Sequence, residues 1–230
     1  MIVAAALCPA PPLLARELTG GDAVLPELRE ACGEAIRRLL RAEPETIAVV
    51  GAAAETGLWD PASRLDLSVF APVARGAAGT PELPSSLGLG ALLLDQAGYA
   101  GRRILQAVGQ DEPAAACVEL GERLARPAER IALLVMADGS ARRSRRAPGH
   151  LDERSAGFDA AVEHAIRSGD LGALAAVDPA LARELMATGR PAWQVLSGAM
   201  RVLRPAADVL YAGDPFGVAY LVASLSTALP

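Results

Sequence analysis

Lysine is absent from this 230-residue chain, so all 22 basic residues are arginine, and only two histidines are present. Acidic residues outnumber the arginines, and the formal net charge is −5. A chain with this balance is not expected to bind nucleic acid by neutralising phosphates. Aromatic residues make up only 3% of the chain, so a core must be built mainly from Ala, Val and Leu.

Cysteine and long apolar runs are also scarce. Cys8, Cys32 and Cys117 lie far apart and form no Cys-x-x-Cys pair, which argues against a zinc site or a disulfide framework. The apolar start of the chain, residues 1–8, contains no basic residue and is cut short by Pro9. No run reaches the ~18 apolar residues that a membrane span needs. We therefore expect a cytoplasmic protein without a membrane segment.

Familiar catalytic motifs are missing as well. The sequence has no Gly-x-Gly-x-x-Gly after a strand, no Walker loop and no Gly-x-Ser-x-Gly elbow. Dinucleotide binding, P-loop chemistry and α/β-hydrolase chemistry therefore have no support.

Short apolar runs alternate with amphipathic segments along the chain. Apolar residues make up 52% and charged residues 21%, as in a packed globular protein, and the length favours a single domain over residues 1–230. The pattern predicts strands over 2–7, 46–50, 65–70, 103–108, 131–136, 209–211 and 218–225. It predicts helices over 26–41, 85–98, 113–126, 155–168, 179–188 and 191–202. Such alternation indicates an α/β fold whose sheet is covered on both faces.

In sheets of this kind, ligands bind beyond the carboxyl ends of the strands. The loops 9–14, 51–56 and 138–150 are therefore the candidate site, together with the turn at 213–217. Asp138 and Ser140 follow the strongest strand, and His150 lies in the same loop, so these three residues are candidates for proton transfer. The alternative is a turn that satisfies its own backbone.

Four arginines follow at positions 142, 143, 145 and 146 with no acid between them. Guanidinium groups match carboxylates and phosphates, so Arg142 is a candidate for gripping an anionic ligand. A solvated loop, or a face that pairs with acids of another subunit, would explain the same pattern. Glu55 and Asp214 lie in the other candidate loops and are further candidates for ligand binding. The second histidine, His164, falls in the middle of a predicted helix, where a solvated role is favoured.

Four segments together resemble a known family. They are Leu-Cys-Pro-Ala-Pro-Pro-Leu-Leu at 7–14, Met-Ala-Asp-Gly-Ser-Ala at 136–141, Ala-Pro-Gly-His-Leu-Asp at 147–152 and Pro-Phe-Gly at 215–217. The ensemble is similar to the class III extradiol ring-cleavage dioxygenases, or LigB-like proteins, and to an actinobacterial branch of that family. The resemblance spans nearly the whole chain. It implies a three-layer α/β/α sandwich with a mixed, mostly parallel central sheet.

The resemblance also implies where a metal site would lie. Family members that cleave catechols hold Fe(II) with two histidines and a glutamate, and a further histidine acts as base. Carried over, the first ligand falls on Ala10, and the second falls among the alanines at 52–54, with Glu55 as the nearest polar group. The base falls on Ala141. Alanine has no lone pair to offer iron, so we expect neither a metal nor another cofactor here.

Three hypotheses follow. The leading one is a LigB-like protein that has lost the iron site and binds a small anionic or aromatic molecule, or a partner, as a homo-oligomer. The second is a metal-free or Mg-dependent enzyme in which Asp138, Ser140 and His150 supply proton transfer and Arg142 grips an anionic substrate. His150 together with Glu55 and Asp214 would offer one nitrogen and two oxygens, a set that suits Mg or Mn better than Fe(II). The third is a dioxygenase completed by a partner subunit.

Overall fold

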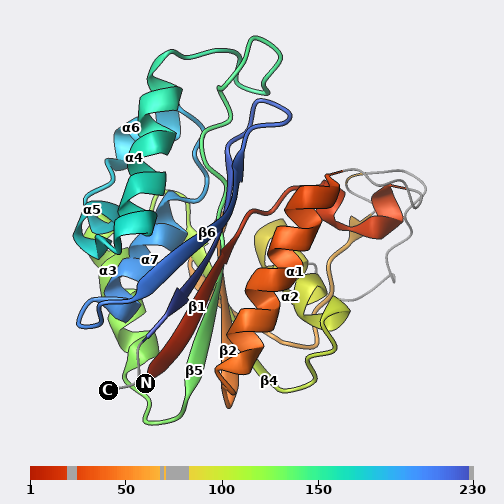
Figure 1. Ribbon diagram of the computed structural model, residues 1–230, viewed down its shortest axis with the longest axis vertical. Helices are drawn as coiled ribbons and strands as arrows, with labels where there is room; N and C mark the ends of the chain where they lie inside the picture. The colour runs from red at the N-terminus through yellow and green to blue at the C-terminus, as the bar shows by residue number, and fades with distance from the viewer. Residues whose placement is uncertain (20–24, 68–69, 71–82, 228–230) are drawn as a thin grey trace.

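The structure is a computed structural model that describes residues 1–19, 25–67, 70 and 83–227. Its centre is a seven-stranded sheet with the strand order β3-β4-β2-β5-β1-β7-β6 (Figure 1). The strands are β1 (Ile2–Cys8), β2 (Thr46–Ala53), β3 (Gly57–Trp59), β4 (Arg102–Gly109), β5 (Ile131–Met136), β6 (Ala206–Gly213) and β7 (Tyr220–Ser226). Strands β4, β2, β5 and β1 are parallel, whereas β3, β7 and β6 run antiparallel to their neighbours.

Helices cover both faces of this sheet (Figure 1). One face carries α1 (Pro26–Arg41) and α2 (Ser85–Gln96). The other carries α3 (Ala114–Ala125), α4 (Arg154–Ser168), α5 (Leu171–Ala175), α6 (Pro179–Glu184) and α7 (Arg190–Met200). Two short 3₁₀ turns, Pro12–Leu14 and Arg16–Leu18, lie between β1 and α1. The predicted α/β sandwich with a mixed sheet and a parallel centre is confirmed.

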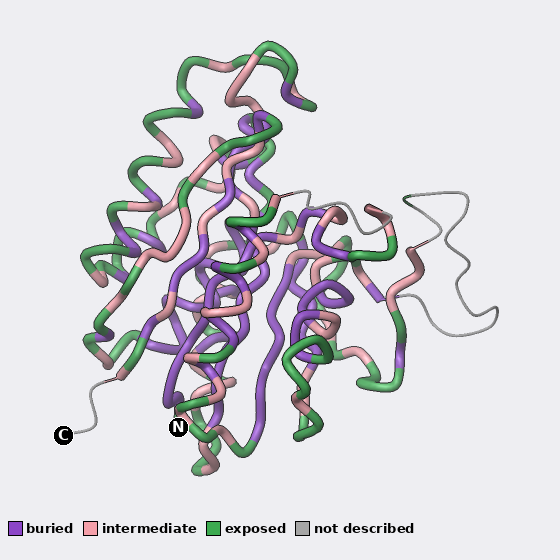
Figure 2. Tube along the Cα trace, turned by 45° about the vertical axis from the view of Figure 1, so that its right-hand side comes forward, coloured by how far each residue is buried: buried purple, intermediate pink, exposed green. Residues whose placement is uncertain are grey.

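The central strands are buried on both faces of the sheet, which explains why their sequences are uninterrupted apolar runs. Every residue of β1 and β5 is buried, and the side chains of β5 alternate between two separate cores. Leu133 and Val135 pack on the α7 side, whereas Leu134 and Met136 pack on the α1 and α2 side. Figure 2 shows this buried centre flanked by exposed outer helices. Among the described residues, no helix combines the length and the apolarity that crossing a membrane requires.

Some elements differ from the prediction. Within the predicted strand 65–70, residues 65–67 and 70 are not in a strand, and residues 68–69 lie outside the described part of the chain. The edge strand β3 and the five-residue helix α5 were not predicted, because each is too short to show a period in the sequence. The predicted helix 179–188 ends at Glu184, where the chain turns into the α6–α7 connection.

Helices α3 and α7 pack closely because a glycine stands at the contact on each side. A Cβ added to Gly198 would overlap the carbonyl oxygen of Val118, and one added to Gly121 would overlap the carbonyl oxygen of Val195. The two backbones therefore touch without side chains between them. Helix α7 is buried along its whole length, so this contact fixes its depth in the molecule.

Gly198→Ala should lower the free energy of unfolding by about 1–3 kcal/mol, because the added methyl group forces two backbones apart. Gly157→Ala is the matched control: nothing lies within 4 Å of a Cβ at Gly157 in α4. That variant should be stabilised by up to about 1 kcal/mol, since alanine favours a helix over glycine. Urea unfolding measures both. Equal effects of the two substitutions would contradict the close backbone contact.

Candidate functional site

The carboxyl ends of β1, β2 and β5 open onto a cavity of about 700 Å³, called here the strand-end cavity. This is the place where α/β sheets bind their ligands. Its apolar lining includes Ala10, Ala52, Ala53, Ala54, Trp59 and Met136. Its polar lining includes Glu55, Thr56, Ser85, Gln110, Asp138 and Thr188. No arginine or histidine is among the described residues that line it.

The chain brings β1 and β5 to a common end at this cavity. Pro9 has no N–H to continue the ladder of β1, so the strand stops at Cys8 and the chain turns. The N–H of Ala137 still donates to the carbonyl of Cys8 at 2.8 Å. One step further, the backbone N–H of Ala10 donates to Oδ1 of Asp138, also at 2.8 Å. This side-chain bond ties the two strand ends together and holds the Asp138 carboxyl at the cavity.

Asp138 is the most perturbed acid of the cavity. Burial raises its pKa from 3.8 to about 6, although the bond from the Ala10 N–H opposes the rise. The carboxylate also acts on Tyr220 of β7, whose hydroxyl pKa is raised by burial first and by the negative charge of Asp138 second. Asp138 therefore changes charge within about one unit of neutrality.

The opposite wall is built from the connections that follow β2 and β4. The N–H of Gln110 donates to the carbonyl of Ala53 at 3.0 Å, which extends the pairing of these strands by one bond. The hydroxyl of Thr56 accepts the N–H of Gly109 at 2.8 Å and donates to the carboxylate of Glu112. The two loops are thus fixed to one another, and the wall they form is preorganised.

Arg190, which the sequence analysis did not single out, supports this wall from behind. It is 2% exposed. Its guanidinium donates to the carbonyl oxygens of Gln110 and Glu112 and to Oε1 of Gln194, the last at 3.0 Å. Burial lowers its pKa. No sequence signal marks Arg190, because two of its partners are backbone oxygens some 80 residues away in the chain.

The predicted candidates Ser140 and Asp214 lie elsewhere. Ser140 is fully buried; its hydroxyl donates to Oδ2 of Asp159 at 2.5 Å, and its N–H donates to Oδ1 at 2.9 Å. Asp214 pairs with Arg143 at 2.8 Å. Asp159, Arg143 and Asp214 line a second cavity of about 200 Å³ between α4 and the β6–β7 hairpin. Asp159 was missed, since a single acid in a helix carries no signal of its own.

The predicted candidates His150 and Arg142 do not line the strand-end cavity either. His150 is exposed, has a φ of 61°, and donates its N–H to the carbonyl of Ala147 at 2.9 Å. The carbonyl of Arg142 accepts the N–H of Asp152 at 3.0 Å, so the loop satisfies its own backbone. The structure therefore brings Asp138 and Glu55 together in one cavity, without Ser140, His150, Arg142 or Asp214.

The donor set of the cavity does not fit a ferrous ion held by two imidazoles. Ala10, Ala52, Ala53 and Ala54 form its wall, while Glu55 and Asp138 offer only oxygen. The position of the expected base, Ala141, is buried, and its N–H donates to the carbonyl of Leu185. His164 is exposed on α4. Within the described residues, no group of three or more His, Cys, Asp or Glu side chains is placed to hold a metal.

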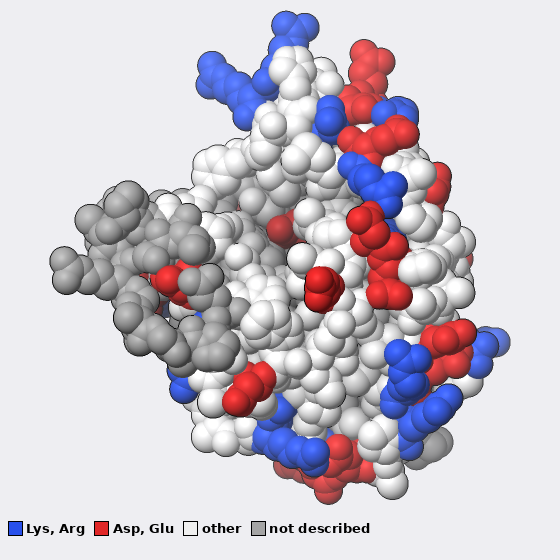
Figure 3. All heavy atoms as spheres, turned by 180° about the vertical axis from the view of Figure 1, so that it is seen from behind, with Lys and Arg blue, Asp and Glu red and all other residues white. Residues whose placement is uncertain are grey.

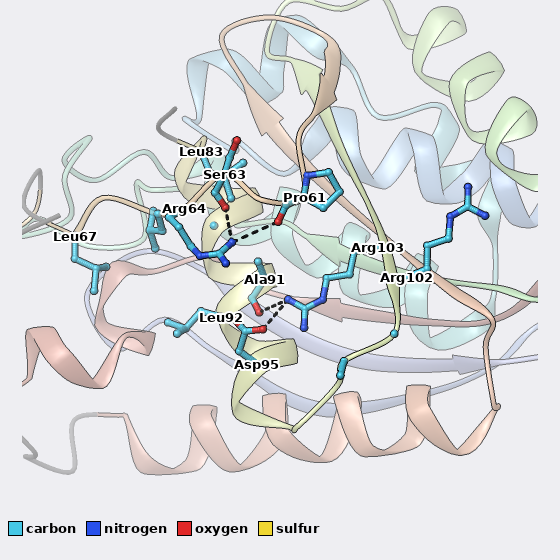
Figure 4. Close-up of a pocket in the computed structure, with 14 residues that line it drawn as sticks. Pro61, Ser63, Arg64, Leu67, Leu83, Ala91, Leu92, Asp95, Arg102 and Arg103 are labelled. Atoms are coloured by element: carbon cyan, nitrogen blue, oxygen red, sulfur yellow. Dashed lines mark hydrogen bonds and ion pairs between the residues drawn. The ribbon is translucent and has the colours of Figure 1, made fainter. Parts of the chain in front are cut away.

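A further cavity, of about 570 Å³, lies at the opposite end of β4 (Figure 4). Arg103 points into it but is paired with Asp95 at 2.7 Å and with the carbonyl of Ala91. Arg64 donates to backbone oxygens, including that of Ser63 at 3.2 Å. Because each of the three guanidinium groups in its described lining is paired with or donates to the protein itself, this cavity is a weaker candidate for an anionic ligand than its arginines suggest.

No protein-family model and no curated protein matches the sequence. Among solved structures, the chain is similar to the crystal structure of the uncharacterized protein JW3007 from Escherichia coli K12. The match covers 97% of this chain and 99% of that chain, with a TM-score of 0.56 and 15% sequence identity. At that identity the likeness shows a shared fold and carries no information on the ligand.

Proposed function

We propose that this protein is a LigB-like scaffold that binds a small organic molecule in the strand-end cavity without an iron centre. One observation carries the proposal: four alanines form the wall at the strand ends, beside a preorganised carboxyl group. The cavity is roomy enough for an aromatic ring and is mostly apolar, as small-molecule sites are. The family resemblance of the sequence supports the scaffold, and the alanines argue against the family's metal chemistry.

The chain contains two tryptophans, and one of them lines the cavity, which offers a direct test. Catechol is the probe, in buffer with a metal chelator, and fluorescence excited at the indole band is the readout. We expect a saturable change in emission that requires no added Fe(II), because Trp59 lies beside the bound ring. Trp59→Phe should abolish the change. Trp193 is 2% exposed and packs on Phe158, so it serves as the internal reference.

Two results would count against the proposal. The first is the absence of any saturable response in the folded protein. The second is a response, or ring cleavage, that appears only after Fe(II) is added. The cytoplasmic location and the homo-oligomeric state suggested by the sequence stay predictions.

A further inference from the structure

Given the proposed function, the charged groups that line the strand-end cavity indicate which class of ligand it binds. Asp138 and Glu55 are the charged groups of its described lining, and both are acids. Neither takes part in an ion pair among the described residues. A third carboxylate, that of Glu112, holds the Thr56 hydroxyl at the same wall. The cavity is therefore a region of negative potential.

In the described part of the chain, the guanidinium groups nearest to this cavity are engaged by the protein itself. The guanidinium of Arg190 lies behind the wall and is engaged by the carbonyl oxygens of Gln110 and Glu112. Arg183 pairs with Asp111 at 2.6 Å. The N-terminus of α2 at Ser85 supplies about half an elementary charge, less than the two carboxylates together. In the rear view of Figure 3, arginines gather at the upper and lower margins, while the middle of the face is uncharged or acidic.

The apolar part of the cavity lining is complementary to a flat ligand with a weakly hydrated surface, such as an aromatic ring. Trp59 supplies an indole ring, Met136 a polarisable thioether, and the alanines a smooth wall. Aromatic rings attract organic cations through their π faces, and tryptophan does so best. Among the described lining residues, an anionic ligand would meet two carboxylates and no guanidinium. The expectation of an anion came from residues 142–146, and none of these lines the strand-end cavity.

We infer that the strand-end cavity selects an organic cation: a protonated amine or a quaternary ammonium on a flat aromatic body. The ammonium group lies against Asp138, with Glu55 at the rim, and the ring lies along Trp59 and the alanine wall. Ammonium–carboxylate bonds are charge-assisted and stronger than neutral ones.

Three probes of nearly equal size separate charge from shape: benzylamine, benzyl alcohol and benzoate, measured at pH 8 by calorimetry or by Trp59 fluorescence. Asp138 and benzylamine are then both charged. We expect benzylamine to bind about tenfold more tightly than benzyl alcohol, and benzoate to bind weakest. Asp138→Asn should weaken benzylamine by about tenfold and change benzyl alcohol by less than about twofold. Glu55→Gln should have a smaller effect of the same sign, because Glu55 is exposed.

Glu119→Gln is the matched control, since it removes one exposed acid from α3 outside the cavity lining. It should leave all three affinities unchanged. Equal affinities for the three probes, or tightest binding of benzoate, would overturn the cation preference and leave the proposed function standing. If the folded protein binds none of the probes and catechol gives no response either, the proposed function falls as well.

Discussion

Asp138→Asn is expected to raise the free energy of unfolding by about 2–3 kcal/mol at pH 8 and to leave it nearly unchanged at pH 4. Burial raises the pKa of Asp138 from 3.8 to about 6. Each unit of such a shift corresponds to about 1.4 kcal/mol of preference for the protonated form in the folded state. Asparagine keeps an oxygen that can accept the N–H of Ala10, so the bond between the strand ends is retained.

The direction of this pH dependence follows from the linkage between proton binding and folding. The folded pKa lies above the unfolded value, so the folded protein binds the proton more tightly than the unfolded chain does. The favourable contribution of Asp138 is complete below about pH 4 and is lost as the pH rises to about 6. Above that window the folded state carries the cost of an ionised carboxylate that is only partly hydrated. The uncharged amide does not carry that cost.

Urea unfolding of both proteins at pH 4 and pH 8 measures this difference. The control Glu119→Gln removes an exposed carboxylate and should show little change at either pH. A gain of the same size at both pH values would contradict the account, and so would a loss at pH 8. Binding sites commonly lower the stability of a protein in this way, because a side chain positioned to contact a ligand is often not in the position that is most stable for the fold.

Arg190→Met is expected to lower the free energy of unfolding by about 3–5 kcal/mol. The side chain is 2% exposed and serves two backbone carbonyls, of Gln110 and Glu112, and the side chain of Gln194. Methionine fills a similar volume but donates no hydrogen bond. Each buried oxygen left without a partner costs about 1–3 kcal/mol. The loop that carries Gln110 into the strand-end cavity should loosen as well, so ligand affinity should fall with stability.

Arg201→Met is the matched control. Arg201 is paired with Glu122 at 3.1 Å, but its side chain is 65% exposed. Exposed ion pairs contribute about 1 kcal/mol or less, so this substitution should be nearly neutral. The two variants are compared by urea unfolding under the same conditions. A similar small loss for both would mean that Arg190 is not the anchor of the β4–α3 loop.

Much of the fold could be predicted from the sequence, because its central strands are unbroken apolar runs. The run Ile131–Met136 and the run that begins at Ile2 belong to the strands most deeply buried in the sheet. The Leu-Asp-Leu alternation at 65–67 imitated a strand, but those residues form none. Helix α5, five residues long and capped by Asp170, is defined by its packing on α7 and not by a period in its sequence.

The candidate site was predictable in part. Asp138 and Glu55 follow buried parallel strands, and the carboxyl ends of such strands meet at one edge of a sheet, so their convergence could be expected. Ser140 does not line the strand-end cavity, because the chain turns at Gly139, whose N–H donates to the carbonyl oxygen of Ala219 at 2.8 Å. That bond directs the chain away from the strand-end cavity and towards α4, where the carboxylate of Asp159 accepts a hydrogen bond from the Ser140 hydroxyl.

The remaining site residues depend on contacts that only the folded chain makes. Arg190 acts through backbone oxygens, which carry no residue-specific signal. Trp59 enters the cavity because the short edge strand β3 pairs with β4, with Trp59 opposite Leu105. The aromatic component of the cavity and its support by Arg190 could therefore not be derived from the order of the residues alone.

The central claim is that the strand-end cavity, which has alanines and two carboxylates in its wall and no imidazole in its described lining, holds no Fe(II). Anaerobic calorimetric titration of Fe(II) into the protein tests it most directly, with the double variant Glu55→Gln, Asp138→Asn measured in parallel. We predict no stoichiometric uptake of Fe(II) by either protein. One equivalent bound tightly by the native chain and lost in the double variant would contradict the claim.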